Sequence, residues 1–180
     1  EIIGKETKEI LPEIIKEILP KLNFPKSMKW GSSKLNFARP IRWILSLWED
    51  EILSFEINGL KSGNVSFGNR FQKLDNPVKI NKIEEYKDKL KTVFAIADRN
   101  ERKALITKQL IDLFSGTDKE IVEDRNLLEI VTDLVEYPTA VIADFDEKYL
   151  QLPQKVITST LSQHQKYFAI KDKAGNIINH

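Results

Sequence analysis

The sequence has 180 residues, of which 41% are hydrophobic and 31% are charged, and 28 lysines and arginines face 27 aspartates and glutamates. This composition is typical of a folded globular chain, and the length suits one domain or one domain with a small appendage. Without cysteine there is no disulfide, thiol catalysis or cysteine-ligated zinc, and two histidines cannot build a histidine-rich metal site.

The first predicted element is an amphipathic helix, which we assign to a lead-in over residues 1–22. Its apolar stripe consists of Ile10, Leu11, Ile14, Ile15, Ile18, Leu19 and Leu22. Because proline fits only the first turn of a helix, Pro12 predicts a regular start near Ile10, and Pro20 kinks or closes the other end. A helix packed on its own domain is favoured over a partner-binding helix.

The next stretch, Phe24–Trp43, is called the basic stretch below. It interleaves cations with aromatic rings and contains no acid: the cations are Lys26, Lys29, Lys34, Arg39 and Arg42, and the rings are Phe24, Trp30, Phe37 and Trp43. Such a pattern suits polyanions, because cations meet phosphates while flat rings stack on bases. The alternative is a buried aromatic cluster with solvated cations, and composition alone favours this alternative. Net charge is near zero, so attraction for nucleic acid has to come from such a local patch.

Residues Ile41–Ile57 are rich in β-branched and aromatic residues around a Glu49–Asp50 turn, which predicts a β-hairpin. The glycine-rich run Gly59–Phe71 follows. No lysine–serine or lysine–threonine pair follows its last glycine, as a phosphate-binding loop would require, so we interpret it as a flexible loop carrying Lys61, Asn64 and Arg70.

The second half alternates short strands and helices without a strict βαβ rhythm, which predicts an α+β fold. Asp98 and Asp124 are the expected N-caps of two helices. The expected strands are Pro77–Ile80, Val93–Ala97, Thr139–Ala143 and a second hairpin over Tyr167–Ile178, and the expected helices are Ile83–Leu90, Asp98–Phe114, a helix after Asp124 and one opened by Pro153. We expect Trp30, Trp43, Phe55, Leu105, Leu128, Val131 and Val141 to be largely buried.

A polar group ends the last helix, where His164 lies between two glutamines and Lys166 follows the second of them. A structural histidine at a helix end is the alternative to a functional one. Ser159 and His164 are poorly spaced for a nucleophile–base pair, so catalysis by this chain alone is not expected.

Four stretches resemble, in order, the β subunit of the bacterial heterotetrameric glycyl-tRNA synthetase. They are FPKSMKWG with FARPIRW inside the basic stretch, GLKSGNVSFGNRF at Gly59–Phe71, LLEIVTDLVEYP at Leu127–Pro138 and LPQKVITSTLSQHQKYF at Leu152–Phe168. Together they cover almost the whole chain from about Leu22 onward, and four ordered matches are far more specific than any one of them.

The resemblance implies an enzyme that joins glycine to its tRNA with ATP and Mg²⁺, in which the α subunit forms the adenylate and the β subunit handles much of the tRNA. For this chain it implies no cofactor of its own, and as partners the α subunit, the rest of the β subunit and tRNA(Gly). It also implies that residues 23–180 are an α+β domain similar to the B3/B4 editing-type domain of phenylalanyl-tRNA synthetase, truncated at the C-terminal end. The family's Gly-His-Arg-Phe motif has Asn69 at the histidine position here, and an amide cannot titrate.

We therefore expect a tRNA-contact and assembly domain, with an editing-type hydrolytic pocket, vestigial or active, or a pure scaffold as alternatives. The candidate nucleic-acid-binding residues are Lys26, Lys29, Trp30, Arg39, Arg42, Lys61, Arg70, His164 and Lys166. The chain begins without methionine and has no membrane-length apolar run or signal-peptide pattern, so we expect an internal piece of a cytoplasmic protein with no membrane partner.

Overall fold

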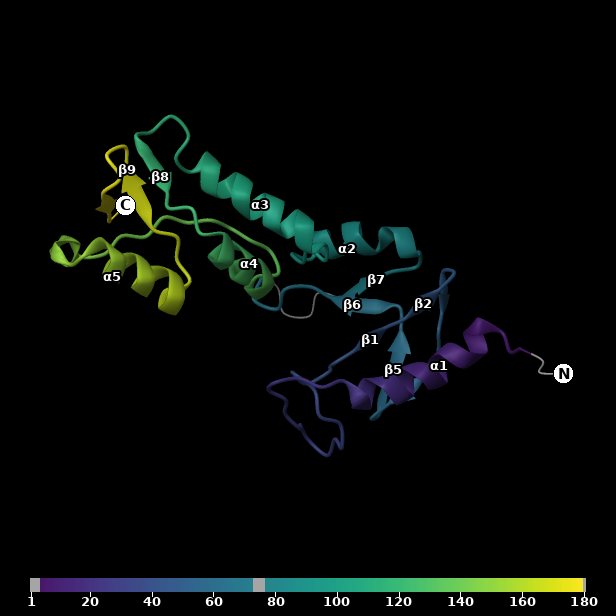
Figure 1. Ribbon diagram of the computed structural model, residues 1–180. Coiled ribbons are helices and arrows are strands. Elements are labelled where there is room, and N and C mark those ends of the chain that lie inside the picture. The colour runs from purple at the N-terminus through teal and green to yellow at the C-terminus, as the bar shows by residue number, and fades with distance from the viewer. Residues whose placement is uncertain (1–3, 73–76, 180) are drawn as a thin grey trace. The chain divides into compact units, whose positions relative to one another are not determined.

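The structure is a computed structural model that describes residues 4–72 and 77–179. The chain forms two compact units, Glu1–Val93 and Phe94–His180. Both mix helices with small sheets (Figure 1), as the α+β prediction requires. The described part of the predicted lead-in, residues 4–22, belongs to the first unit, and the predicted boundary after residue 22 stays a prediction.

The first unit begins with helix α1 (Thr7–Ile18) and the 3₁₀ turn η1 (Leu19–Lys21). The helix starts at Thr7, so Pro12 lies inside it and leaves one backbone carbonyl without its usual donor. None of its residues is fully buried, and Ile14 and Ile18 remain 42% and 51% exposed. The amphipathic helix is confirmed, and its apolar stripe is only partly covered within this unit.

Three small sheets follow α1, and each is defined by its strand pairs. The first has the order β1 (Ile44–Leu45), β5 (Leu60–Gly63), β4 (Glu56–Ile57), with β1 parallel and β4 antiparallel to β5. The others are the antiparallel pairs β2 (Leu47–Trp48) with β3 (Glu51–Ile52), and β6 (Val65–Phe67) with β7 (Pro77–Lys79).

The hairpin turn predicted at Glu49–Asp50 is confirmed, because β2 and β3 are joined by these two residues, both with positive φ. The prediction of a loop over Gly59–Phe71 is wrong, since most of that run forms β5 and β6. The missed signal is Asn58–Gly59, the strongest short hairpin signal, whose φ angles of 53° and 80° suit a type I′ turn between β4 and β5.

The first unit ends with the 3₁₀ turn η2 (Ile83–Glu85) and helix α2 (Tyr86–Thr92), which confirm the helix expected there. Its core contains Leu53, Phe55, Ile80, Leu90 and Val93, all nine-tenths or more buried. Asn69 donates its backbone N–H to the carbonyl of Val93 at 2.9 Å, which draws the end of β6 against the turn after α2.

The second unit combines three α-helices with one antiparallel sheet in its described residues. Its elements are α3 (Arg99–Asp112), β8 (Lys119–Ile121), α4 (Arg125–Leu134), the 3₁₀ helix η3 (Glu147–Gln151), α5 (Gln154–Ser159), the π-helical turn η4 (Thr160–Gln165), β9 (Ile170–Asp172) and β10 (Ile177–Ile178). The sheet order is β10-β9-β8. A small core of Ile157, Ala169 and Ile177 joins the sheet to α5.

Both predicted N-caps are confirmed. The side chain of Asp98 accepts the N–H groups of Asn100 and Glu101, and that of Asp124 accepts the N–H of Leu127 at 2.8 Å. The hairpin of β9 and β10 is confirmed too, although its first strand begins at Ile170.

Two strand predictions in this unit are wrong, because neither Val93–Ala97 nor Thr139–Ala143 pairs with a strand among residues 4–72 and 77–179. Side chains bond the backbone of both segments instead: Arg102 donates to the carbonyls of Ile96 and Ala97, and Gln109 bonds Pro138 and Ala140. Burial was predicted correctly for Phe55, whereas Trp30, Leu105, Leu128 and Val131 are only half-buried, Trp43 is 37% exposed and Val141 is 79% exposed. Over the same described residues, no helix is long and apolar enough to cross a membrane.

An ion-pair network joins α3 to α4. Arg99 contacts Asp133 through Nε at 2.7 Å and Glu129 through Nη2 at 2.8 Å, and Lys103 pairs with Glu129. Hydrogen bonds from Lys103 and Arg99 lower the pKa of Glu129, and the hydrogen bond from Arg99 lowers the pKa of Asp133. The same two carboxylates raise the pKa of Arg99.

We expect the second unit to lose stability in acid through this network. A carboxyl whose pKa is lower in the folded than in the unfolded state stabilises the fold above its unfolded pKa, and this contribution disappears as pH falls through the folded pKa. The loss should begin near the ordinary values, 4.5 for Glu129 and 3.8 for Asp133, and continue below them. Melting temperatures measured against pH test this. Arg99→Met should flatten the decline, and an equal decline in that variant would contradict the assignment.

Candidate nucleic-acid interface

The middle of the basic stretch is a closed loop. The backbones of Met28 and Phe37 exchange hydrogen bonds at 2.9 and 3.2 Å, and Gly31 makes the reversal between them with φ at +54°. The Phe24 ring packs edge-on against Phe37 with centroids 4.7 Å apart. The Met28–Phe37 bridge and the reversal at Gly31 thus close the middle of the stretch into a loop.

One buried side chain anchors this loop to the rest of the unit. Leu35 is 7% exposed, and its backbone N–H donates to the hydroxyl of Ser33 at 3.0 Å. The side-chain amide of Asn58, from the β4–β5 turn, donates to the same hydroxyl at 2.6 Å. The loop is therefore tied to the β4–β5 hairpin, and its charged side chains stand on a fixed support.

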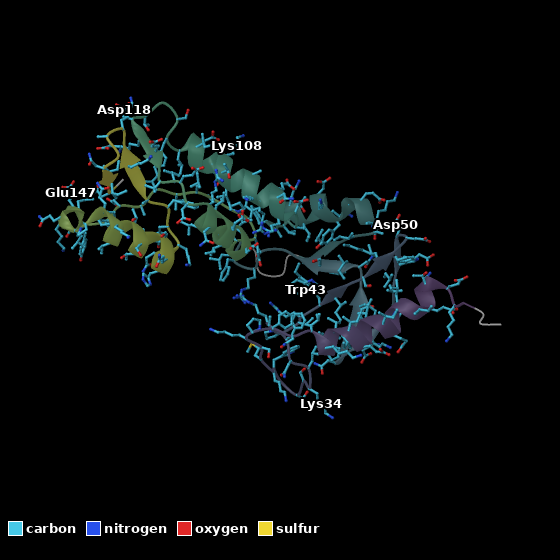
Figure 2. All side chains as sticks on the ribbon, viewed as in Figure 1. Lys34, Trp43, Asp50, Lys108, Asp118 and Glu147 are labelled. Carbon is cyan, nitrogen blue, oxygen red and sulfur yellow. The ribbon has the colours of Figure 1, made fainter. Side chains whose placement is uncertain are left out.

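The cations of the basic stretch are all exposed: Lys26, Lys29, Lys34, Arg39 and Arg42. None of them makes an ion pair or a side-chain hydrogen bond with the described residues. Figure 2 shows Lys34 at the end of the loop farthest from Trp43. An unpaired, solvated cation loses no existing partner when it meets a phosphate.

The acids of the β2–β3 hairpin do not compensate these cations. Asp50 accepts the backbone N–H of Ile83 at 2.8 Å, and Glu51 pairs with Lys8 of α1. No pair joins Arg39 or Arg42 to an acid in the described part of the unit. A buried arginine–carboxylate arrangement across this hairpin is therefore absent from residues 4–72 and 77–93.

The two tryptophans differ in environment. Trp30 is half-buried beside the loop reversal. Trp43 is 37% exposed, packs at a tilt against Phe67 with 4.8 Å between ring centroids, and donates its indole N–H to the Ser66 hydroxyl at 3.3 Å. Each thus presents part of a ring to solvent while the remainder is held in the unit.

Two further predicted residues lie in the first unit. Lys61 is exposed on β5, opposite Glu56 on β4. Arg70 follows β6, and its guanidinium lies 4.9 Å from the ring centre of Phe71, which is 84% exposed. We did not predict Phe71 as a site residue. Its signal in the sequence was the arginine–phenylalanine pair at the end of the glycine-rich run, a cation beside a flat ring.

The remaining predicted residues, His164 and Lys166, lie in the second unit. His164 is exposed on the π-helical turn η4. Lys166 is half-buried, adopts a left-handed backbone with φ at +60°, and donates its ammonium to the carbonyl of Gln163 at 2.7 Å. Seven of the nine candidates, Lys26, Lys29, Trp30, Arg39, Arg42, Lys61 and Arg70, thus share the first unit, and these two do not.

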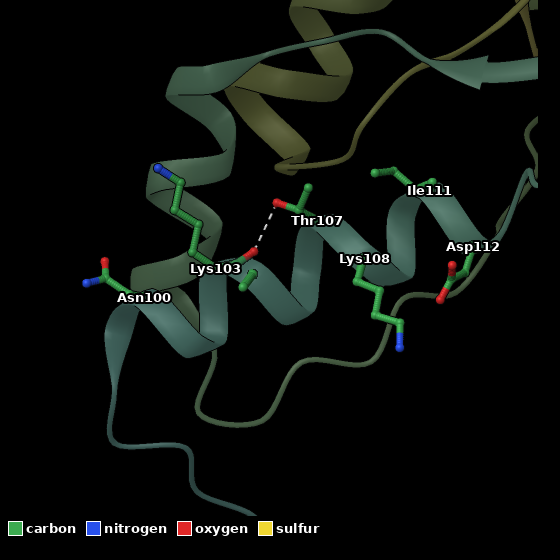
Figure 3. A pocket seen from close by; sticks show the side chains of 7 residues that line it. Asn100, Lys103, Thr107, Lys108, Ile111 and Asp112 are labelled. Carbon is green, nitrogen blue, oxygen red and sulfur yellow. Dashed lines mark hydrogen bonds between the residues drawn. The ribbon is translucent and has the colours of Figure 1, made fainter.

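The second unit contains hollows rather than a catalytic constellation. One of about 370 Å³ is lined mostly by apolar side chains, with Lys166 and Tyr167 at its edge. Another of about 540 Å³ follows the outer face of α3 (Figure 3), where Lys103 and Lys108 point to opposite sides. Over the part of the chain that the structure describes, Ser159 and His164 share no hydrogen bond, and no acid or histidine cluster could hold a metal.

Comparison with known proteins gives the family. The family model described as "Glycyl-tRNA synthetase beta subunit" matches residues 1–180. Curated proteins named glycine–tRNA ligase beta subunit are 41% identical over 98% of this chain in Thermodesulfovibrio yellowstonii, 43% over 93% in Clostridioides difficile and 39% over 100% in Listeria monocytogenes. The matches span 26%, 24% and 26% of those relatives, about a quarter of their length. The chain therefore belongs to the glycyl-tRNA synthetase β-subunit family.

Proposed function

We propose that this chain is the tRNA-contact and assembly part of a glycine–tRNA ligase β subunit. The observation that carries the proposal is the group of exposed, unpaired cations on the basic stretch, held beside partly exposed aromatic rings. The α subunit would form glycyl-adenylate from glycine and ATP with Mg²⁺, in the cytoplasm. This chain would hold tRNA(Gly) and connect the α subunit to the rest of the β subunit.

The basic stretch combines the two features that bind RNA, positive charge and flat ring surface. RNA binding draws most of its affinity from phosphate contacts that release counterions, and single-stranded ends are held by stacking on flat side chains. The basic stretch supplies cations that α1 and the β2–β3 hairpin leave unneutralised. Trp43 and Phe71 supply ring surface, each next in sequence to an arginine.

A hydrolytic pocket is the second candidate, and the hollow of about 370 Å³ in the second unit favours it. We propose that the chain's fold is related to the B3/B4 editing-type domain of phenylalanyl-tRNA synthetase, in which such a hollow would be a remnant. Glycine has no side chain for an editing pocket to discriminate, so the chemical need for hydrolysis is small. Deacylation of mischarged tRNA by the complete subunit would favour this candidate over the first.

Arg39→Ala and Arg42→Ala, each in the complete synthetase, should weaken tRNA binding and flatten its salt dependence. Each lost phosphate contact lowers the slope of log affinity against log salt by roughly one. Glycyl-adenylate formation without tRNA should stay unchanged, because both arginines are exposed and make no ion pair with residues 4–72 or 77–179. Binding titrations at several salt concentrations, with adenylate formation assayed in parallel, provide the measurement.

Lys82→Ala is the matched control, since Lys82 is an exposed cation of the same unit outside the basic stretch. It should leave both affinity and slope near those of the unaltered enzyme. An unchanged slope in both arginine variants, with a normal melting temperature, would remove these two residues from the interface. Loss of adenylate formation in either variant would also speak against a contact role.

A further inference from the structure

The segment Pro138–Asp146 connects α4 to η3 as neither helix nor strand. One contact shows how it is held. The side-chain amide of Gln109, on α3, donates to the carbonyl of Pro138 at 3.2 Å and accepts the N–H of Ala140 at 2.7 Å. In a parallel sheet, each residue faces one residue of the neighbouring strand. Its N–H donates to the carbonyl of the residue before that facing residue, and its C=O accepts the N–H of the residue after it. The Gln109 amide therefore imitates one residue of an adjacent strand.

The Gln109 amide bonds the segment from one side only. Successive residues of an extended chain direct their N–H and C=O groups to alternate sides, so the groups of Thr139, Val141 and Ala143 point away from Gln109. No hydrogen bond from residues 4–72 or 77–179 reaches the backbone of Val141, Ile142, Ala143 or Asp144. The segment has the backbone of an edge strand with one side open.

The side chains of this segment are also those of an exposed edge strand. Val141 is 79% exposed and Ile142 is 48% exposed, in a Thr-Ala-Val-Ile-Ala run whose β-branched residues favour strands. The segment also borders the hollow of about 370 Å³, whose lining includes Ile178 of β10. Strand β10 pairs only with β9 in the described chain, so its other edge is open as well. Apolar side chains and unpaired backbone groups thus occur on one segment.

We propose that Thr139–Asp144 is a strand position completed by β-strand addition, and that the added strand comes from the same β subunit, outside these 180 residues. A helix would cover the apolar side chains but leave the backbone groups unpaired, whereas a strand satisfies both. The matched region is about a quarter of the relatives' length, so most of such a subunit is available to supply the strand. The side chain of Asn179 already bonds the carbonyl of Phe145 at 3.2 Å, next to the open segment.

Hydrogen exchange of the complete β subunit, alone and with its α subunit, tests the proposal. The amides of Val141 and Ala143, which face the open side, should exchange on the order of 100-fold more slowly than an unstructured chain of that sequence, already in the β subunit alone. Val141→Pro, which removes an N–H on the open side, should abolish the protection of its neighbours. Val141→Ala keeps that N–H and should retain most of the protection, which separates backbone pairing from loss of the side chain.

Three results would overturn the inference. Exchange of the Val141 and Ala143 amides at the unstructured rate in the complete subunit would show that nothing pairs with them. Protection that appears only with the α subunit would assign the strand to another chain. Equal protection in Val141→Pro and Val141→Ala would show that the segment is covered without backbone pairing.

Discussion

Gly68→Ala should unfold the first unit or come close to it. A β-carbon at this position would lie 1.8 Å from the carbonyl oxygen of Val93 and 2.4 Å from its Cβ, so the backbone itself is in the way. The carbonyl cannot retreat freely, because it accepts the N–H of Asn69 at 2.9 Å, and Val93 is 5% exposed in the core. We expect a loss of about 3 kcal/mol or more, measured by chemical denaturation.

Gly63→Ala is the matched control for this result. Gly63 lies on β5, has no positive φ, and an added β-carbon would meet no atom within 4 Å. Since alanine loses less backbone entropy than glycine on folding, the control should be neutral or slightly stabilising. If Gly68→Ala melts like Gly63→Ala, the close approach of the β6 end to Val93 is not a feature of the folded protein.

The features that could be predicted from the sequence are those fixed by local chemistry. Asp98 and Asp124 cap helices because a carboxylate within reach of free N–H groups needs nothing distant. The Glu49–Asp50 hairpin and the strand at Pro77 were likewise correct. The Asn58–Gly59 signal was just as local, and overlooking it turned β5 into a predicted loop.

The failures depend on contacts far apart in the chain. The run after Pro138 looks like a core strand, yet its partner within this unit is the side chain of Gln109. That residue lies 29 positions before Pro138, whose carbonyl it bonds. The hydrophobic periodicity of a sequence does not reveal that a side chain bonds a segment in place of a strand. For the candidate site, the sequence supplied which cations and rings occur together, while only the structure places Lys26 and Arg42 in solvent and Arg70 beside an exposed Phe71. That His164 and Lys166 belong to the other unit was beyond reach of spacing arguments.

Arg102→Met should be the most damaging polar substitution in the second unit. Arg102 donates through Nη1 to the carbonyls of Ile96 at 2.6 Å and Ala97 at 3.1 Å, and through Nε to that of Thr132 at 3.2 Å. It thus joins the segment before α3 to the last turn of α4, where a cation is also favoured by the helix dipole. Methionine preserves much of the stem but leaves these carbonyls without their donor, which should cost about 2–4 kcal/mol.

Two control variants separate the loss of these three hydrogen bonds from the loss of the positive charge. Arg125→Met makes the same chemical change where the side chain is 90% exposed and its acidic partner is 4.0 Å away, and it should leave stability nearly unchanged. Arg102→Lys keeps the charge but has no planar fork to reach three carbonyls at once, so its loss should lie between the other two variants. Denaturant midpoints of the three variants give the order. If Arg102→Lys is as stable as the unaltered protein, the positive charge at the end of α4 contributes more than the three hydrogen bonds. The link between α3 and α4 is then electrostatic.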